Sequence, residues 1–174
     1  MTDVDQLGVN MDTGLRARTT AAWPWISTAA RLGLAAVFLV AGGTKIGDLA
    51  ASGRAVNAYQ LMPYNAAKVV GAVQPFLEIA LGLLLLIGIA VRLSAGIAAV
   101  LLVIFIGGIV SAWARGLQID CGCFSKGGEL GAGQIPKYGS EILRDIGFLV
   151  LAGILLWRPR TRFSVDSILM GIAK

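Results

Sequence analysis

The chain has 174 residues, 56% hydrophobic and only 14% charged, which is too little charge to cover a soluble domain, so most of its surface should face lipid. The net charge of +5 comes from scattered basic residues rather than a basic face, which argues against nucleic-acid binding. The sequence contains no histidine, which excludes histidine general bases and histidine-ligated metal or haem.

The first 22 residues are polar and contain three aspartates ahead of Arg16 and Arg18. A secretory signal begins with positive charge and continues directly into an apolar core, and this segment shows neither feature. We expect residues 1–22 to form a polar arm in the cytoplasm.

Four apolar stretches follow, and each approaches the length of about 20 residues that a helix needs to cross hydrocarbon. Because backbone polar groups cannot stay unpaired in lipid, each stretch should be helical. The sequence therefore predicts an all-α fold, a polytopic four-helix membrane bundle over residues 23–160 with a cytoplasmic tail at 161–174. The predicted helices lie at about 25–46, 66–91, 93–114 and 140–157.

The connections between these helices predict how they are arranged. One or two residues around Arg92 link the second and third helices, which should therefore form an antiparallel hairpin. An even number of spans places the longer connections, at about 47–65 and 115–139, on one side of the membrane. Lysine and arginine near helix ends favour the cytoplasm, and arginines occur in the amino-terminal arm and directly after the fourth helix. We expect both termini in the cytoplasm and both long connections outside it.

Glu78 lies about midway along the second predicted helix, three residues after Pro75. A charge at that depth costs several kcal/mol unless it is neutralised, paired or hydrated. Lys45 and Arg144 lie toward the outer ends of their helices and are its expected partners. Glu78 is then either half of a buried ion pair that fixes the helix register, or a proton acceptor or quinone-pocket residue coupled to thiol oxidation. Arg31, near the inner end of its helix, is expected to reach lipid headgroups.

The two cysteines of the chain lie two positions apart in Asp120-Cys121-Gly122-Cys123-Phe124, within the second long connection. The glycine supplies the backbone freedom that a disulfide at this spacing requires. Such a strained ring is easily reduced and removes little entropy from the unfolded chain, which favours a redox-exchanging pair over a structural staple. Two alternatives stay open: half of a thiolate metal site that a second molecule completes, and a pair of inert thiols.

No cysteine lies within a predicted helix, so the chain cannot pass electrons across the bilayer through its own thiols. Electrons must be exchanged with a thiol partner on the outer face or with a bound acceptor such as a quinone. Lys126 and Arg115 are the nearest cations in the sequence that would favour a thiolate. Tyr59, in the other long connection, is either a contact residue for this site or an interface anchor.

The chain resembles the MauE family of methylamine-utilisation membrane proteins, within the broader DoxX-like group of four-helix membrane proteins. The resemblance covers about residues 31–157, and its strongest element is the motif at 120–124. Family sequences often carry Arg-Asn near the start of the last helix, where this chain has Arg144-Asp145. The supporting elements are Arg31, Gly43-Thr44-Lys45, Tyr59, Leu61-Met62-Pro63 and Pro75-Phe76-Leu77-Glu78.

The resemblance implies a multi-pass protein of the bacterial plasma membrane that assists disulfide formation or thiol redox poise in exported proteins, beside an extracytoplasmic thioredoxin-like partner. Cys121 and Cys123 would then cycle between dithiol and disulfide, as in a thiol–disulfide oxidoreductase. The competing hypothesis is a non-enzymatic membrane scaffold, or a subunit of a larger complex, whose loop disulfide shapes a docking surface. The residues point to no cofactor other than a quinone.

Overall fold

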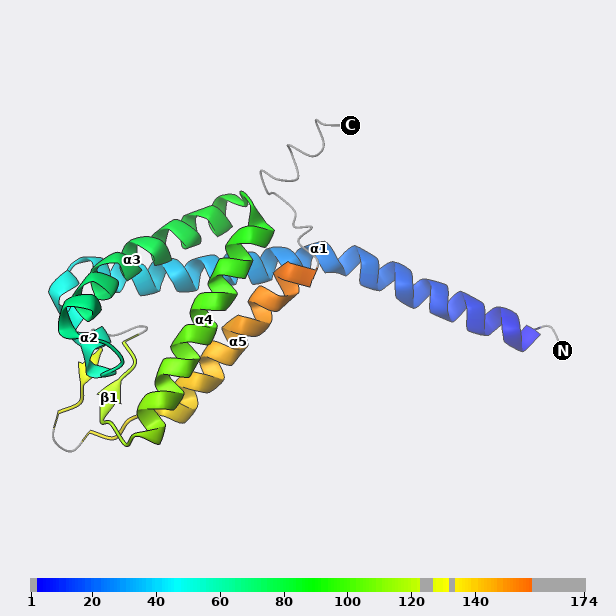
Figure 1. Cartoon of the computed structure of the whole chain (residues 1–174). Helices are drawn as coiled ribbons and strands as arrows, with labels where there is room; N and C mark the ends of the chain where they lie inside the picture. The colour runs from blue at the N-terminus through cyan, green and yellow to red at the C-terminus, as the bar shows by residue number, and fades with distance from the viewer. Residues whose placement is uncertain (1–2, 123–126, 132–133, 158–174) are drawn as a thin grey trace.

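The computed structural model describes residues 3–122, 127–131 and 134–157, with side chains described from Trp23 onward. Within these residues there are five helices and one pair of short strands (Figure 1). Three helical segments are long and apolar enough to cross a membrane: Trp23–Ile46, Tyr64–Ile87 and Val91–Ala114. The elements in chain order are α1 (Asp3–Ile46), α2 (Leu49–Ala58), α3 (Tyr64–Ile87), α4 (Val91–Ala114), β1 (Ile119–Asp120), β2 (Gly128–Glu129) and α5 (Tyr138–Trp157).

The four predicted apolar helices are present, but several boundaries and one element differ from the prediction. Helix α1 begins at Asp3, so the backbone of the predicted polar arm continues the first helix. Helix α3 ends at Ile87 rather than near residue 91, because Gly88 adopts a left-handed conformation (φ 80°) that closes the last turn. The antiparallel β1–β2 pair, with Asp120 opposite Gly128, adds a small sheet to a fold predicted to be all-α.

Helix α2 was not predicted, and it lies within the first long connection. Its start is capped by Asp48, whose carboxylate accepts a hydrogen bond from the backbone N–H of Ala51 at 2.8 Å. It packs on α3 so closely that a Cβ at Gly71 would lie 2.5 Å from the carbonyl oxygen of Ser52. Only glycine fits there, and the contact holds α2 against the start of α3.

The long helices pack mainly in two pairs, α1 with α3 and α4 with α5, and α1 also contacts α5. Figure 1 shows α3 and α4 diverging from the short turn that joins them, so they meet at one end instead of packing along their length as the predicted hairpin would. Buried apolar side chains from all four helices meet in one core: Ala30, Leu34, Ala35, Phe38, Leu81, Leu85, Val91, Ala95, Ala98, Leu102, Ala152 and Leu155.

Helices α1 and α3 approach each other most closely near Gly42. A Cβ added to Gly42 would lie 2.7 Å from the carbonyl oxygen of Pro75 and 3.1 Å from the Cβ of Glu78. The neighbouring Gly43 has open space at the same position. Since Lys45 follows Gly42 within one helical turn, this crossing brings the end of α1 next to Glu78.

At the other end of α3, Arg31 closes the helix. Its side chain is only 2% exposed, and its Nη1 donates to the carbonyl oxygens of Leu85 and Leu86 at 3.0 and 3.1 Å. These carbonyls belong to the last turn of α3, which has no intrahelical donors for them. The expectation that Arg31 reaches lipid headgroups is therefore wrong: its charge serves as a helix cap inside the protein.

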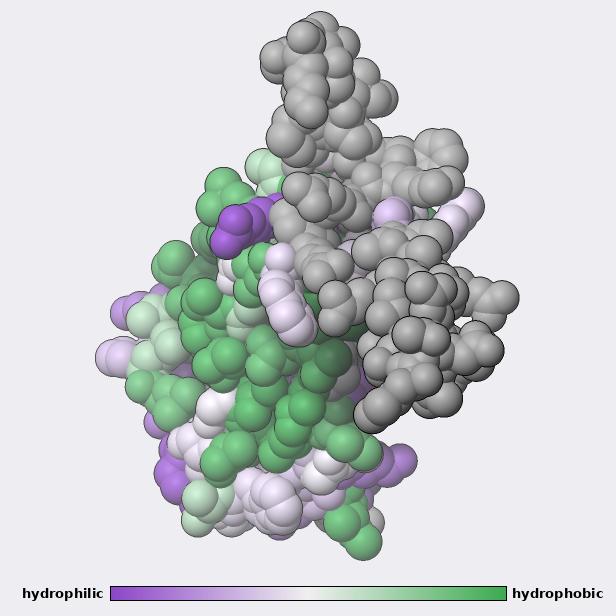
Figure 2. All heavy atoms as spheres, turned by 90° about the vertical axis from the view of Figure 1, so that its right-hand side faces the viewer, coloured by the Kyte–Doolittle hydropathy of each residue, from purple (hydrophilic) through white to green (hydrophobic). Residues whose placement is uncertain are grey.

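The outer surface is broadly apolar. Figure 2 shows a continuous hydrophobic area over the middle of the molecule and a more polar edge below it. Many large apolar side chains are more than half exposed, among them Val69, Leu93, Val100 and Ile104. A soluble protein rarely exposes an apolar area of this extent, whereas lipid tails cover it without cost.

Candidate functional site

Cys121 follows β1, at the end of the molecule where the two long connections meet. The loop there is folded tightly, because a Cβ at Gly122 would lie 2.8 Å from the Cα of Gly127. Gly122 also has a positive φ of 71°, and its N–H donates to the carboxylate of Asp120 at 3.0 Å. Glycine is therefore needed at position 122 for its conformation as well as for space. Cys123, the second predicted site cysteine, and Lys126 lie outside the described residues.

Two predicted site residues, Tyr59 and Arg144, and one that was not predicted, Glu141, come together at Cys121. The hydroxyl of Tyr59 donates to the backbone carbonyl of Cys121 at 3.2 Å, which joins the first long connection to the second. The guanidinium of Arg144 donates through Nη2 to the sulfur of Cys121 at 3.7 Å. The side chain of Glu141, one helical turn earlier on α5, is also hydrogen-bonded to Cys121.

Arg144 lies beside the thiol, a contact that the sequence did not predict. Arg115, the described one of the two cations expected to favour the thiolate, lies at the end of α4 and donates to the backbone carbonyls of Tyr59, Gln60 and Ser111. The Arg144 guanidinium is held by the adjacent carboxylate of Asp145, at 3.1 and 3.2 Å. A fixed positive charge near a sulfur favours its thiolate form, which is the nucleophile in thiol chemistry.

Asp120, Cys121 and Glu141 place one potential metal-ligand atom each within 4.8 Å of one another. The sequence did not suggest this group, since Glu141 is separated from the other two by about twenty residues. A thiolate and two carboxylates are acceptable zinc ligands. The guanidinium of Arg144 occupies the same neighbourhood, and its positive charge opposes a cation there.

Glu78 is paired as predicted, with one of its two expected partners. The Nζ of Lys45 lies 2.8 and 3.1 Å from the two carboxylate oxygens, and both side chains are almost fully buried. The amide of Gln74 donates a further hydrogen bond at 2.8 Å from one turn earlier on α3. Arg144 does not contact Glu78, so that alternative is wrong. The contacts satisfy a charge that would otherwise be very unfavourable in the membrane.

Asp145, which the sequence marked only as a departure from the family's Arg-Asn, is a second buried carboxylate. One oxygen accepts from Arg144, while Oδ2 accepts no hydrogen bond from the residues that the structure describes. A cavity of about 20 Å³ separates Asp145 from Glu78, and its other lining residues are apolar. That volume is enough for one water molecule, which needs roughly 10–15 Å³.

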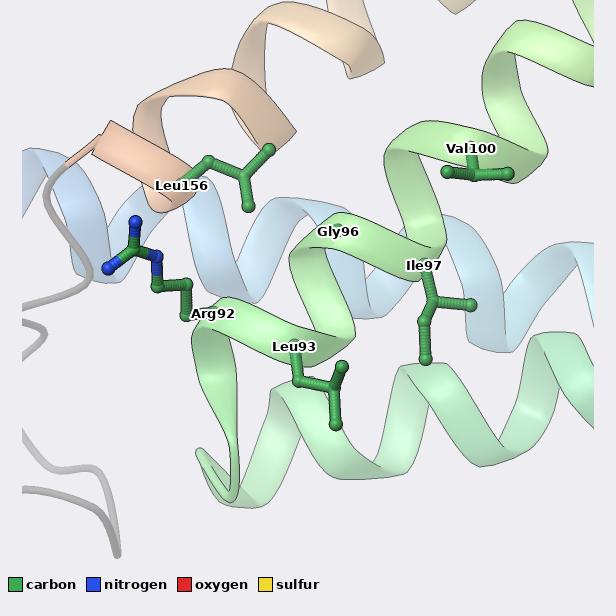
Figure 3. Close-up of a pocket in the computed structure, with 6 residues that line it drawn as sticks. All are labelled: Arg92, Leu93, Gly96, Ile97, Val100 and Leu156. Carbon is green, nitrogen blue, oxygen red and sulfur yellow. The ribbon is translucent and has the colours of Figure 1, made fainter.

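A larger cavity, about 140 Å³, reaches Cys121 from the side. It lies between α3 and α4, with α2 and the residues after it forming another wall, and Tyr59, Gln74 and Gly108 line it together with apolar side chains. A third hollow is shown in Figure 3, and its lining includes Arg92, Leu93 and Ile97 of α4 and Leu156 of α5. It is open and extends along α4 from Arg92 to Val100, so roughly 20 Å of helix separates it from the last turn of α4, and it is remote from the thiol.

Long apolar helices, a lipid-compatible surface and charges buried between helices define a multi-pass helical membrane protein, with one thiol site where its long connections meet. The chain belongs to the MauE family: the family model described as methylamine utilisation protein MauE matches residues 23–158. Searches of curated proteins and of solved structures gave no match.

Proposed function

We propose that the protein is a membrane-embedded thiol–disulfide redox protein whose Cys121 and Cys123 cycle between dithiol and disulfide. The observation that carries the proposal is the 3.7 Å contact between the Arg144 guanidinium and the sulfur of Cys121. A structural disulfide needs no cation beside it, whereas thiol exchange depends on the thiolate that such a cation favours. Glu141, hydrogen-bonded to Cys121, is placed to accept the thiol proton.

The exchange partner in this proposal is an extracytoplasmic thioredoxin-like protein. A thiolate of one protein attacks a disulfide sulfur of the other, giving a mixed disulfide and releasing one thiolate. The second thiol of the attacking pair then displaces the partner, which leaves as a dithiol. One protein is oxidised to its disulfide while the other gains the same two electrons and two protons, so the step needs no further reactant.

The proposed topology places α5 as a fourth membrane span, both termini in the cytoplasm of a bacterial cell and the Cys121 loop outside. Helix α5 lies along α4, and its Ala152 and Leu155 are fully buried in the shared core. Its charges at Glu141, Arg144 and Asp145 all fall in the first two turns, next to the thiol site. The arginines at 158–162 follow its other end, as cytoplasmic flanks commonly do.

Redox titration of the purified protein tests the proposal. An exchanging pair should have a midpoint within the range of thioredoxin-like proteins, about −270 to −120 mV. Cys121→Ser and Cys123→Ser serve as controls, because neither can form the intramolecular disulfide. A midpoint below about −300 mV would mark a structural bond and favour the scaffold hypothesis. Protection of the thiols by added Zn²⁺, without reversible oxidation, would favour metal binding at Asp120, Cys121 and Glu141.

A further inference from the structure

A cavity of 140 Å³ lies beside Cys121, and thiol exchange with a soluble protein does not explain its presence. Its walls come from the end of α2 and from α3 and α4, which diverge from their shared turn. Most of the lining is apolar, and the polar side chains that line it belong to Ser52, Tyr59 and Gln74, together with Cys121. A protein partner would dock on the loop, not within this space.

The size and the opening of the cavity indicate the kind of ligand it fits. An apolar protein cavity of about 150 Å³ accepts a benzene ring, so 140 Å³ is close to the size of one six-membered ring. Three lining side chains are largely exposed: Leu61 (55%), Val70 (43%) and Ile104 (59%). Val70 and Ile104 lie on helices that are apolar enough to span the membrane, so the mouth opens toward lipid and admits a lipid-dissolved molecule.

Repeated turnover of the proposed thiol pair needs a second electron partner besides the thioredoxin-like protein, and a lipid-dissolved molecule in this cavity would supply one. The sequence has two cysteines, both in the loop, so no thiol relay crosses the bilayer. We propose that the cavity binds the ring of a lipid-soluble quinone and brings it to Cys121. This inference rests on the proposed redox function, and it adds the chemical class of the acceptor and the residues that hold it.

The reaction balances without a further reactant. The two thiols of Cys121 and Cys123 lose two electrons and two protons and form the disulfide, while the quinone takes both and leaves as a quinol. Polar groups at the cavity match this chemistry. Tyr59 holds the backbone of Cys121, and Gln74 connects the cavity to the buried Lys45–Glu78 pair through its hydrogen bond to Glu78.

Two adjacent glycines of α4 provide a matched test. A Cβ at Gly108 would lie 3.4 Å from the ring of Tyr59 at the cavity wall, whereas a Cβ at Gly107 has open space around it. Gly108→Leu should therefore fill the cavity, and Gly107→Leu makes the same chemical change outside it. Binding of decylubiquinone to each full-length protein in detergent is measured by quenching of tryptophan fluorescence.

Decylubiquinone should bind the parent and Gly107→Leu saturably and with similar affinity, and bind Gly108→Leu at least about tenfold more weakly. Oxidation of the dithiol by decylubiquinone should slow by a similar factor in Gly108→Leu, while its oxidation by the water-soluble oxidant diamide stays unchanged. The quinone site would be overturned if the parent did not bind decylubiquinone saturably, or if both variants lost the same amount of affinity. If binding follows this pattern but the thiols neither exchange nor reduce the quinone, the redox function fails while the cavity remains a quinone site.

Discussion

The guanidinium of Arg144 lies 3.7 Å from the sulfur of Cys121, although 23 positions separate the two residues in the chain. The contact exists because α5 begins beside the loop that carries the cysteine and because the carboxylate of Asp145 holds the guanidinium through Nε and Nη2. It joins the thiol to a charged group at the start of a buried helix, so it predicts how reactive the thiol is.

Replacing Arg144 should slow the reaction of Cys121 with a maleimide. In a Cys123→Ser background, Arg144→Gln is expected to lower the rate at neutral pH by about tenfold, which corresponds to about 1.4 kcal/mol and is within reach of one partly screened charge at this distance. Arg115→Gln removes the same charge nearby but not at the sulfur, and it should leave the rate within about twofold of the background protein. Equal rates in both variants would show that Arg144 does not stabilise the thiolate.

The ion pair of Lys45 and Glu78 should contribute to stability and not to the redox potential. Glu78→Gln leaves the Lys45 ammonium buried without its counter-charge and should destabilise the protein by about 3–5 kcal/mol. Thermal unfolding in detergent measures this effect, and Lys45→Met combined with Glu78→Leu should recover much of the loss. If Glu78→Gln left the stability unchanged but slowed the oxidation of the dithiol, Glu78 would instead act in proton transfer.

The close crossing of α1 and α3 predicts opposite effects at two neighbouring glycines. Gly42→Ala pushes a methyl group against the backbone of α3 and should destabilise the protein by about 1–3 kcal/mol. Gly43→Ala meets open space and should stabilise the helix by up to about 1 kcal/mol. Melting temperatures of the two variants, measured in the same detergent, test the crossing; a shift of the same sign in both would contradict it.

The proposed topology predicts where the cysteines can be labelled. A membrane-impermeant maleimide added to intact spheroplasts after mild reduction should label Cys121 or Cys123 without disruption of the membrane. A cysteine introduced at Arg158 in a cysteine-free variant should be labelled only after disruption. The reverse pattern would place the loop in the cytoplasm, where thiols are kept reduced, and would argue against an oxidising partner.

The apolar helices and one buried ion pair could be predicted from the sequence, but most contacts of the site could not. The lengths of the apolar segments indicate the spans directly, and an acid at the depth of Glu78 requires a cation, of which Lys45 was one candidate. Helix α2 lacks a long apolar run, so only its Asp48 cap marked it. The positions of Glu141 and Arg144 at Cys121 depend on how α5 packs against the loop, which no local pattern records.

The measurement that tests the central claim most directly is the trapping of a mixed disulfide. If the pair exchanges with a thioredoxin-like partner, removing the resolving thiol should strand the intermediate, so one of Cys121→Ser and Cys123→Ser should yield a covalent adduct. The other variant should give little adduct, because its attacking thiol is gone. Both variants should fold about as well as the parent, since so short a loop contributes little stability.

Mass spectrometry of the adducts from cells, before and after reduction, identifies the partner. A reducible adduct with an extracytoplasmic thioredoxin-like protein from one variant alone is the predicted result. No adduct from either folded variant, with such proteins present in the cells, would contradict the account.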